Sequence, residues 1–242
     1  MSRFITEHGM TVTAVTTAQM RDVDRVAVEV FQLGILQMME NAGRNLALSA
    51  LDMLDGQTGD ILILAGGGGN GGGALCAGRH LHNFGCRVSV LLDRPAEQLG
   101  SPAAAQLAVL RASGIEVAGI EMSGTLLAGS ALVVDGLIGY GLTQAARGLT
   151  ATLIETCNRH ARLVLSNDVP SGLDATTGAH PGVVIRSDRV VTLAAPKTGL
   201  RGVDNLFLAD IGIPPQVFTA LGIDFVPPFS GQYLLPLTTV DA

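Results

Sequence analysis

The chain has 242 residues, of which 48% are hydrophobic and 15% are charged, so it is long enough to bury a sizeable core within one α/β domain. Its formal net charge of −6 argues against non-specific binding to nucleic acid or to anionic lipid, because both need a basic surface. We therefore expect residues 1–242 to form a single domain whose partner is neither a nucleic acid nor a membrane.

Two amphipathic helices are predicted near the N-terminus. Between Thr16 and Phe31 the apolar residues recur every three or four positions, and the same spacing continues from Ile35 to Leu54. Leu36, Met38 and Met39 together offer more apolar surface than one packing face requires. A homodimer contact through the second helix is therefore a hypothesis of this sequence.

The central part of the chain alternates short apolar runs with helix-length segments. The predicted strands are residues 60–65, 87–92, 114–118, 131–135, 162–167 and 189–194. Such nearly continuous apolar strands are typical of a parallel sheet that is covered on both faces. We expect a three-layer αβα, Rossmann-like, doubly wound fold with a mostly parallel sheet and extra N-terminal helices. The proline-rich residues 225–242 lack periodicity and are expected to lie across the body or to be mobile.

A glycine-rich segment, residues 66–73, lies between the apolar run 61–64 and a helical pattern at 75–81. A strand, then glycines, then the start of a helix exposes backbone N–H groups at the positive end of the helix dipole. This arrangement suits a phosphate or another anion. The structural alternative is a tight turn that needs glycine only for positive φ.

The same glycines match the dinucleotide pattern G-x-G-x-x-G in more than one register, which makes that match uninformative. Asp93 ends the next predicted strand, where the acid of a Rossmann fold would hold a ribose hydroxyl. A conventional NAD-dependent oxidoreductase is therefore an alternative that the sequence leaves open.

Three oxygen-bearing side chains each follow an apolar strand: Asn70, Asp135 and Ser171. Each has an ordinary alternative role as a turn or cap residue. Because neighbouring parallel strands end at one rim of a sheet, we expect these side chains to gather there. An amide, a carboxylate and a hydroxyl are ligands for a monovalent or hard divalent cation rather than for zinc.

Asp168 follows another predicted strand and precedes Val169-Pro170. The proline stiffens the turn, so the carboxylate is held in one place and is a candidate general acid and base. Its structural alternative is a turn or helix cap, which is the role that we expect for Asp174.

The remaining polar residues exclude several classes of protein. His80 and His82 are two positions apart and face different sides of a helix, and no zinc-ligand or hydrolase motif is present. Three cysteines are an odd number that fits a reducing compartment, and the first residues lack the apolar segment of a secretory signal. Residues 61–78 are uncharged but too rich in glycine for a membrane helix. We expect a cytoplasmic protein.

Four segments in this order resemble the YjeF N-terminal domain family, and the likeness extends over roughly residues 15–215. They are residues 36–44, the glycine segment with residues 77–81, residues 134–142, and residues 168–174 with Thr177-Gly178. Residues 192–200, which include Lys197, are also similar to a late strand of the family. Lys197 is the chain's single lysine, and genome composition is as good an explanation of that count as any physical cause.

Enzyme members of this family are isomerases that interconvert the R and S hydrates of NADH and NADPH, a repair of damaged cofactor. The resemblance implies that Asn70, Asp135 and Ser171 hold a potassium ion and that Asp168 is the acid and base beside the hydrated nicotinamide. It implies dinucleotide contacts at Gly69, Asn70, Gly71, Gly72, Gly73, Gly139, Tyr140, Gly141, Leu142, Thr143, Gln144 and Ala145.

The chain departs from the family pattern at three of these positions. Members typically read Gly-Asn-Asn-Gly-Gly-Asp-Gly, whereas residues 68–74 have glycine at 69 and 73, and Tyr140 replaces the usual threonine. Two polar side chains that the family pattern would direct at the ligand are thus absent, which is expected to weaken binding or to change the ligand. A non-catalytic nucleotide-binding domain of the same fold is the alternative to the epimerase.

Overall fold

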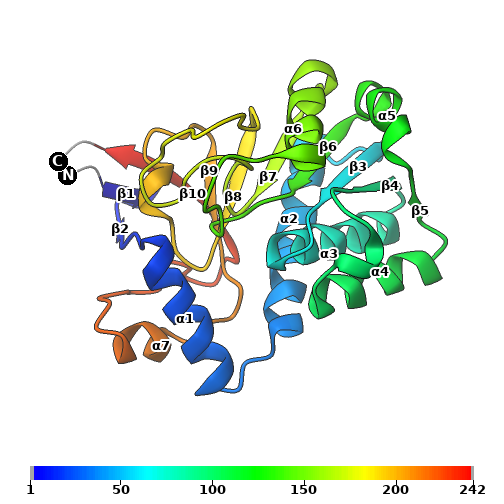
Figure 1. Ribbon diagram of the computed structural model, residues 1–242. Coiled ribbons are helices and arrows are strands. Elements are labelled where there is room, and N and C mark those ends of the chain that lie inside the picture. The colour runs from blue at the N-terminus through cyan, green and yellow to red at the C-terminus, as the bar shows by residue number, and fades with distance from the viewer. Residues whose placement is uncertain (1–2, 241–242) are drawn as a thin grey trace.

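The computed structural model describes residues 3–240, and ten strands within this range form one sheet in the order β2-β1-β10-β9-β8-β7-β6-β3-β4-β5 (Figure 1). The strands are β1 (Arg3–Thr6), β2 (Thr11–Val12), β3 (Asp60–Ala65), β4 (Arg87–Leu92), β5 (Glu116–Val117), β6 (Leu132–Gly136), β7 (Val164–Asn167), β8 (Arg189–Leu193), β9 (Leu206–Ala209) and β10 (Leu234–Val240). The α-helices are α1 (Thr17–Glu29), α2 (Ile35–Met53), α3 (Gly69–Asn83), α4 (Ser101–Ala112), α5 (Ser123–Gly129), α6 (Gly148–His160) and α7 (Pro215–Ala220).

The strands from β9 to β5 are parallel to one another, and β10, β1 and β2 extend the sheet with antiparallel pairing. From β3 the chain moves outward to β4 and β5, and it then returns to place β6 on the other side of β3. The strand order therefore reverses between β3 and β6. In doubly wound sheets a ligand binds outside the carboxyl ends of the strands at such a reversal.

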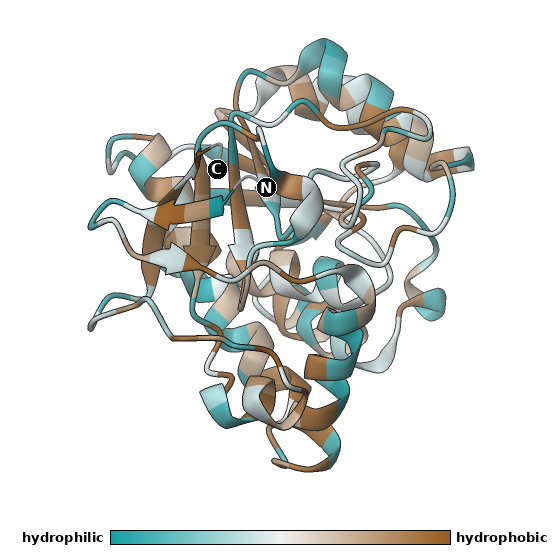
Figure 2. Ribbon diagram, turned by 90° about the vertical axis from the view of Figure 1, so that its left-hand side faces the viewer, coloured by the Kyte–Doolittle hydropathy of each residue, from teal (hydrophilic) through white to brown (hydrophobic). Residues whose placement is uncertain are grey.

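Alternate side chains of β3 pack against helices on opposite faces of the sheet. Ile61 and Ile63 belong to a core shared with α2, α3 and α4, whereas Leu62 and Leu64 belong to a core shared with α5 and α6. In Figure 2 the strands are largely brown while the outer helices carry both brown and teal, as expected for amphipathic elements around a buried sheet. The predicted three-layer fold is confirmed.

The strands that sequence patterns did not identify are the parallel strand β9 and the antiparallel strands β10, β1 and β2, which are neighbours in the sheet. Residues 225–242 were expected to lie across the body or to be mobile, but Leu234–Val240 form β10, paired with both β1 and β9. Pro236 interrupts the apolar alternation of that strand, and its pairing partners come from distant parts of the chain. A local pattern therefore could not reveal it.

Candidate functional site

The glycine segment after β3 is mostly helix rather than loop, because α3 begins at Gly69. None of the glycines from 66 to 73 has positive φ, so the turn explanation considered from sequence does not account for them. A Cβ on Gly71 would lie 1.8 Å from the carbonyl oxygen of Gly66, and a Cβ on Gly66 would lie 2.0 Å from that of Leu137. These two glycines let the start of α3 pack closely against the segment that follows β3, and that segment against the residue that follows β6.

Gly68 and Gly69 have a different environment, because a Cβ on either would meet no atom within 4 Å. They border a cavity of about 740 Å³ at the N-terminal end of α3. Its walls come from α1, α2, residues 137–141 and the segment after β7. Open space beside the backbone at the positive end of a helix is compatible with the predicted anion contact, which stays a prediction.

Asp135 and Ser171 are joined behind this cavity, and both are fully buried. The Ser171 hydroxyl donates to Asp135 Oδ1 at 2.5 Å, and Asp135 Oδ2 accepts from the Ser171 backbone N–H at 2.9 Å and from Ser166 Oγ at 2.7 Å. Burial raises the pKa of Asp135, although these hydrogen bonds oppose the shift. Within residues 3–240, Asp135 makes no ion pair with a basic side chain.

Asn70 lies close to Gly139. Its amide oxygen and nitrogen are buried without a hydrogen-bond partner in the described residues. A Cβ on Gly139 would lie 3.1 Å from Asn70 Oδ1 and 3.2 Å from Asp168 Oδ2, while the neighbouring Ile138 N–H donates to Ser171 Oγ at 2.8 Å. An unpartnered amide oxygen and an uncompensated carboxylate in one region fit a cation that prefers oxygen ligands.

Asp168 directly follows β7 and has φ of 66°, a conformation that side chains other than glycine rarely adopt. Its carboxylate borders the cavity and accepts from four donors: the Lys197 ammonium, the Leu193 N–H at 3.2 Å, the Tyr140 N–H at 3.3 Å and the Thr192 hydroxyl at 3.4 Å. Lys197 is 0% exposed and also donates to the Leu193 carbonyl at 2.8 Å. The single lysine therefore has a physical role, which composition alone left open.

Tyr140 connects Asp168 with a second acid, Asp24 of α1. Its backbone N–H bonds to Asp168, while its hydroxyl donates to Asp24 Oδ2. Burial raises the pKa of Asp24, although the Tyr140 hydrogen bond and the Lys197 charge oppose the rise. The sequence analysis identified α1 only as an amphipathic helix, so Asp24 was missed. The one available signal was an acid within the apolar half of that helix.

The predicted dinucleotide contacts divide into three groups. Those that line the cavity are Gly69, Asn70, Gly73, Gly139, Tyr140 and Gly141. Gly71 and Gly72 are buried, and a Cβ on Gly72 would lie 2.7 Å from Met39 Cε. Leu142, Thr143, Gln144 and Ala145 do not line the cavity. Met38 and Met39, which were expected to offer spare apolar surface, are instead buried residues of the cavity wall.

Asp93 does not have the free carboxylate that a ribose-binding acid needs. Its side chain is 0% exposed, and its two oxygens accept from Arg94 at 2.7 and 3.0 Å and from Thr150 Oγ1 at 2.9 Å. Arg94 borders the cavity, whereas Asp93 does not. Asp93 is therefore not available to bind a ribose hydroxyl, and the oxidoreductase alternative depended on that role.

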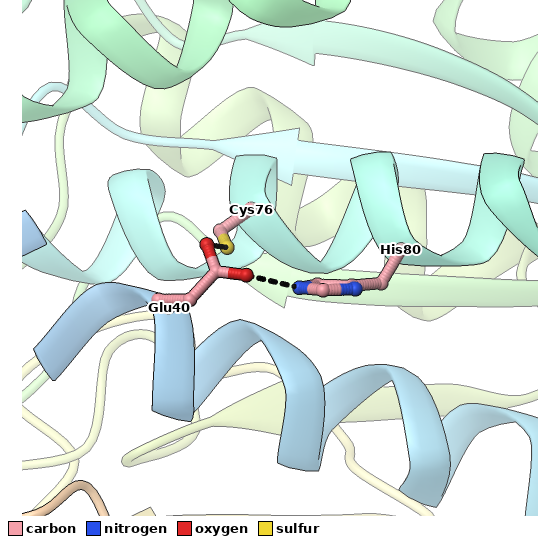
Figure 3. Close-up of side chains that lie close together, drawn as sticks. All are labelled: Glu40, Cys76 and His80. Atoms are coloured by element: carbon pink, nitrogen blue, oxygen red, sulfur yellow. Dashed lines mark hydrogen bonds and ion pairs between the residues drawn. The ribbon is translucent and has the colours of Figure 1, made fainter. Parts of the chain in front are cut away.

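A second cluster of polar side chains lies between α2 and α3, away from the cavity. Figure 3 shows Glu40 directed at Cys76 and His80, with His80 Nε2 at 2.9 Å and Cys76 Sγ at 3.5 Å from its two oxygens. Arg79 donates to Glu40 and, at 3.4 Å, to Cys76 Sγ. Burial raises the pKa of Cys76 to about 12, so the thiol keeps its proton. The arginine and the protonated thiol disfavour a metal, and the cluster joins the two helices.

The fold and the site together define a doubly wound α/β protein with a polar ligand cavity at the reversal of its strand order. Residues 35–199 match the family model described as YjeF-related protein N-terminus. The chain belongs to this family, as the sequence motifs indicated.

Similar proteins cover nearly the whole chain. An NAD(P)H-hydrate epimerase of Dehalogenimonas lykanthroporepellens is 45% identical over 98% of this chain and 97% of its own. One of Rhodopirellula baltica is 31% identical over 86% and 88%, respectively. The bifunctional NAD(P)H-hydrate repair enzyme Nnr of Salinibacter ruber is 35% identical, and the match spans 84% of this chain but 41% of that protein.

Among solved structures, yeast ynu0 (YNL200c) has a TM-score of 0.81 and 21% identity, with coverage of 93% of this chain and 100% of the yeast chain. It therefore supports the fold. Across residues 3–240, no helix is both long and apolar enough to cross a membrane.

Proposed function

We propose that the protein is an NAD(P)H-hydrate epimerase, an isomerase that interconverts the R and S hydrates of NADH and NADPH. The observation that carries this proposal is the 45% identity, over 98% of the chain, to a relative of that name. The cavity supports it independently, because it brings Asn70, Tyr140 and Asp168 to one wall. Its volume of about 740 Å³ is within the range of cofactor sites.

The dinucleotide is proposed to place its phosphates at the start of α3, where Gly68 and Gly69 leave the backbone open. Residues 69–73 and 139–145 remain the proposed substrate contacts. Of these, Gly71 and Gly72 act by shaping the backbone, because they are packed beneath the surface of the cavity. The hydrated nicotinamide then lies against Asp168.

Epimerisation can proceed by opening and closing of the ring, or by departure of the hydroxyl as water and return of water on the opposite face, and the second route is the one proposed here. Protons must therefore be given to one oxygen and removed from another. Asp168 is proposed as the group that exchanges these protons. Lys197, Leu193 and Tyr140 hold its carboxylate in position through donated hydrogen bonds, and Met38 and Met39 contribute apolar wall that excludes bulk water.

Potassium is the proposed cofactor, held by Asn70, Asp135 and Ser171. The unpartnered Asn70 amide and the unpaired Asp135 carboxylate support this assignment, since both are buried oxygen donors. When bound, the ion would supply positive charge that offsets the buried Asp135 carboxylate. Ser171 would orient Asp135 through the hydrogen bond that it already donates.

The proposed activity is tested by incubating the purified protein with one epimer of each hydrate and following the other by chromatography. Acceleration over the spontaneous rate supports the epimerase. Binding of the dinucleotide without acceleration would instead establish the non-catalytic binding domain. The polar positions lost at residues 69 and 73 make this comparison necessary.

We further propose one domain over residues 1–242, a cytoplasmic location and a homodimer. The continuous sheet supports the first, and three buried, unpaired cysteines support the second. For the dimer, the exposed apolar side chains Val30, Phe31, Ile35 and Leu36 near the α1–α2 connection form the candidate contact. Light scattering that shows a monomer at micromolar concentration would remove the dimer.

A further inference from the structure

Two carboxylates border the same cavity in different surroundings, and Tyr140 connects them. Its backbone N–H donates to Asp168, and its side-chain hydroxyl donates to Asp24. The carboxylates are thus separated by the length of a tyrosine side chain, and all three residues contribute to the cavity wall. Asp24 and Tyr140 have no part in the proton exchange that the proposed function assigns to Asp168.

We propose that Tyr140 and Asp24 form a second proton-transfer pair, which serves the opposite face of the hydrated ring from Asp168. The inference rests on the proposed epimerase function and deepens it. It assigns one carboxylate to each face, because the hydroxyl leaves from one face and the water adds to the other.

The hydrogen bonds of the two acids differ in kind. Asp168 accepts from an ammonium, from two backbone N–H groups and, at 3.4 Å, from the Thr192 hydroxyl, and of these four donors only the hydroxyl can also accept. Its carboxylate is therefore suited to take a proton from water. The hydrogen bond of Asp24 comes from a hydroxyl, which can both donate and accept. If Asp24 carries a proton, that bond reverses and the Tyr140 proton is free to face the ligand.

The surroundings of Asp24 are compatible with a role as the acid, with Asp168 as the base. Burial and the charge of Asp168 favour its protonated form, while Lys197 and the Tyr140 hydrogen bond favour the ionised form. Arg21 and Arg25 of the same helix also border the cavity. Two titratable groups in one site whose environments differ in this way are the usual arrangement of an acid and a base.

The step balances as follows. The nitrogen lone pair of the ring forms a C=N bond while the C–O bond breaks, and the departing hydroxyl takes the Tyr140 proton and leaves as water. Tyr140 regains a proton from Asp24. A water on the other face then gives a proton to Asp168 as its oxygen bonds to the carbon, and the C=N pair returns to nitrogen. Solvent then removes the proton from Asp168 and returns one to Asp24, which restores the starting state; for the other epimer the two acids exchange roles.

The test compares D24N, Y140F and the double variant with the wild type, using turnover of each epimer. We expect each single variant to lower kcat by about a hundredfold with little change in KM, and the double variant to be no slower than the singles, since the residues act as one unit. T17V is the matched control. It removes only a hydrogen bond of 3.4 Å to the Tyr140 carbonyl and should retain wild-type kcat.

A pH profile separates proton transfer from a merely structural role. For the epimer whose hydroxyl takes the Tyr140 proton, wild-type kcat should fall as the pH rises through the elevated pKa of Asp24, whereas for the other epimer it should rise, and both pH dependences should be absent in D24N. Circular dichroism checks that each variant is folded. If D24N does not fold, the kcat of Y140F decides the test. The inference would be overturned if these variants kept the wild-type kcat, or if D24N kept the wild-type pH dependence of kcat. Either result would leave the proposed epimerase function intact. An inactive wild type would instead overturn the proposed function itself.

Discussion

Lys197 places its ammonium against the Asp168 carboxylate in a site where the two side chains are only 1% and 5% exposed. The lysine comes from the segment after β8 and the acid from the end of β7, so the pair connects two neighbouring strand ends. A buried ion pair of this kind is costly to break, because removal of one partner leaves the other charge without compensation.

K197M should therefore destabilise the protein by about 3 kcal/mol, because methionine keeps the bulk of lysine but leaves the Asp168 charge buried. Urea unfolding measures the change. The double variant D168N/K197M removes both charges and should recover most of the lost stability. A single variant as stable as the wild type would show that the ion pair contributes nothing to the fold.

D168N should retain dinucleotide binding while turnover falls by at least about a hundredfold, since the amide keeps the size of the side chain but cannot exchange a proton. Calorimetry and epimer chromatography separate the two effects. D174N is the matched control. Asp174 caps a turn by accepting from the N–H groups of Thr176 and Thr177 at 2.9 and 2.8 Å, and it does not border the cavity. Unchanged turnover in D168N would exclude the acid-base role.

Potassium should raise the melting temperature above that measured with choline at equal ionic strength. A concentration ten times the dissociation constant adds about 1.4 kcal/mol to the free energy of unfolding. N70A should lose this increment because it removes the unpartnered amide oxygen. N83A, an exposed position at the other end of α3, should keep it. An equal potassium effect in N70A and the wild type would exclude Asn70 as a ligand.

Much of the fold could be predicted because its central strands are local apolar runs. The expected residues 60–65 and 87–92 coincide with β3 and β4. The positions of Asn70, Asp135, Asp168 and Ser171 near strand ends followed from the same periodicity. Periodicity does not predict which distant segments pair with each other, such as β10 with β1.

The remaining site residues were missed for the same physical reason. Tyr140 contacts Asp24 across 116 positions of sequence, and although Asp24 lies within the apolar half of α1, that position does not reveal its partner. Lys197 lies 29 positions from Asp168, and the resemblance to a family strand drew attention to it without assigning a contact. Such pairs depend on how strand ends converge, which is a property of the tertiary structure.

G71A should destabilise the protein by about 1 to 3 kcal/mol, because its Cβ would lie 1.8 Å from the Gly66 carbonyl oxygen and the backbone must shift. G69A is the matched control in the same helical turn. Its Cβ meets nothing within 4 Å, so its stability should equal or slightly exceed that of the wild type. Chemical denaturation of both variants checks this difference, and equal stabilities would contradict the close-packing explanation of the glycine segment.

Acid should weaken the α2–α3 contact through His80 and Glu40. Burial and the Arg79 charge lower the pKa of His80 against the opposing effect of Glu40, and the charges of Arg79 and His80 outweigh burial to lower the pKa of Glu40.

Both groups bind protons more readily in the unfolded chain, so their stabilising contribution is present at high pH and is lost as the pH falls. For His80 the loss begins near its ordinary value of 6.5 and continues through its lower folded value.

H80Q should therefore show a smaller loss of unfolding free energy between about pH 7.5 and 5.5 than the wild type, as measured by urea midpoints. H82Q changes an exposed histidine of the same helix and should keep the wild-type slope. If H80Q and the wild type lose stability equally over this interval, the pH dependence arises from groups outside the cluster.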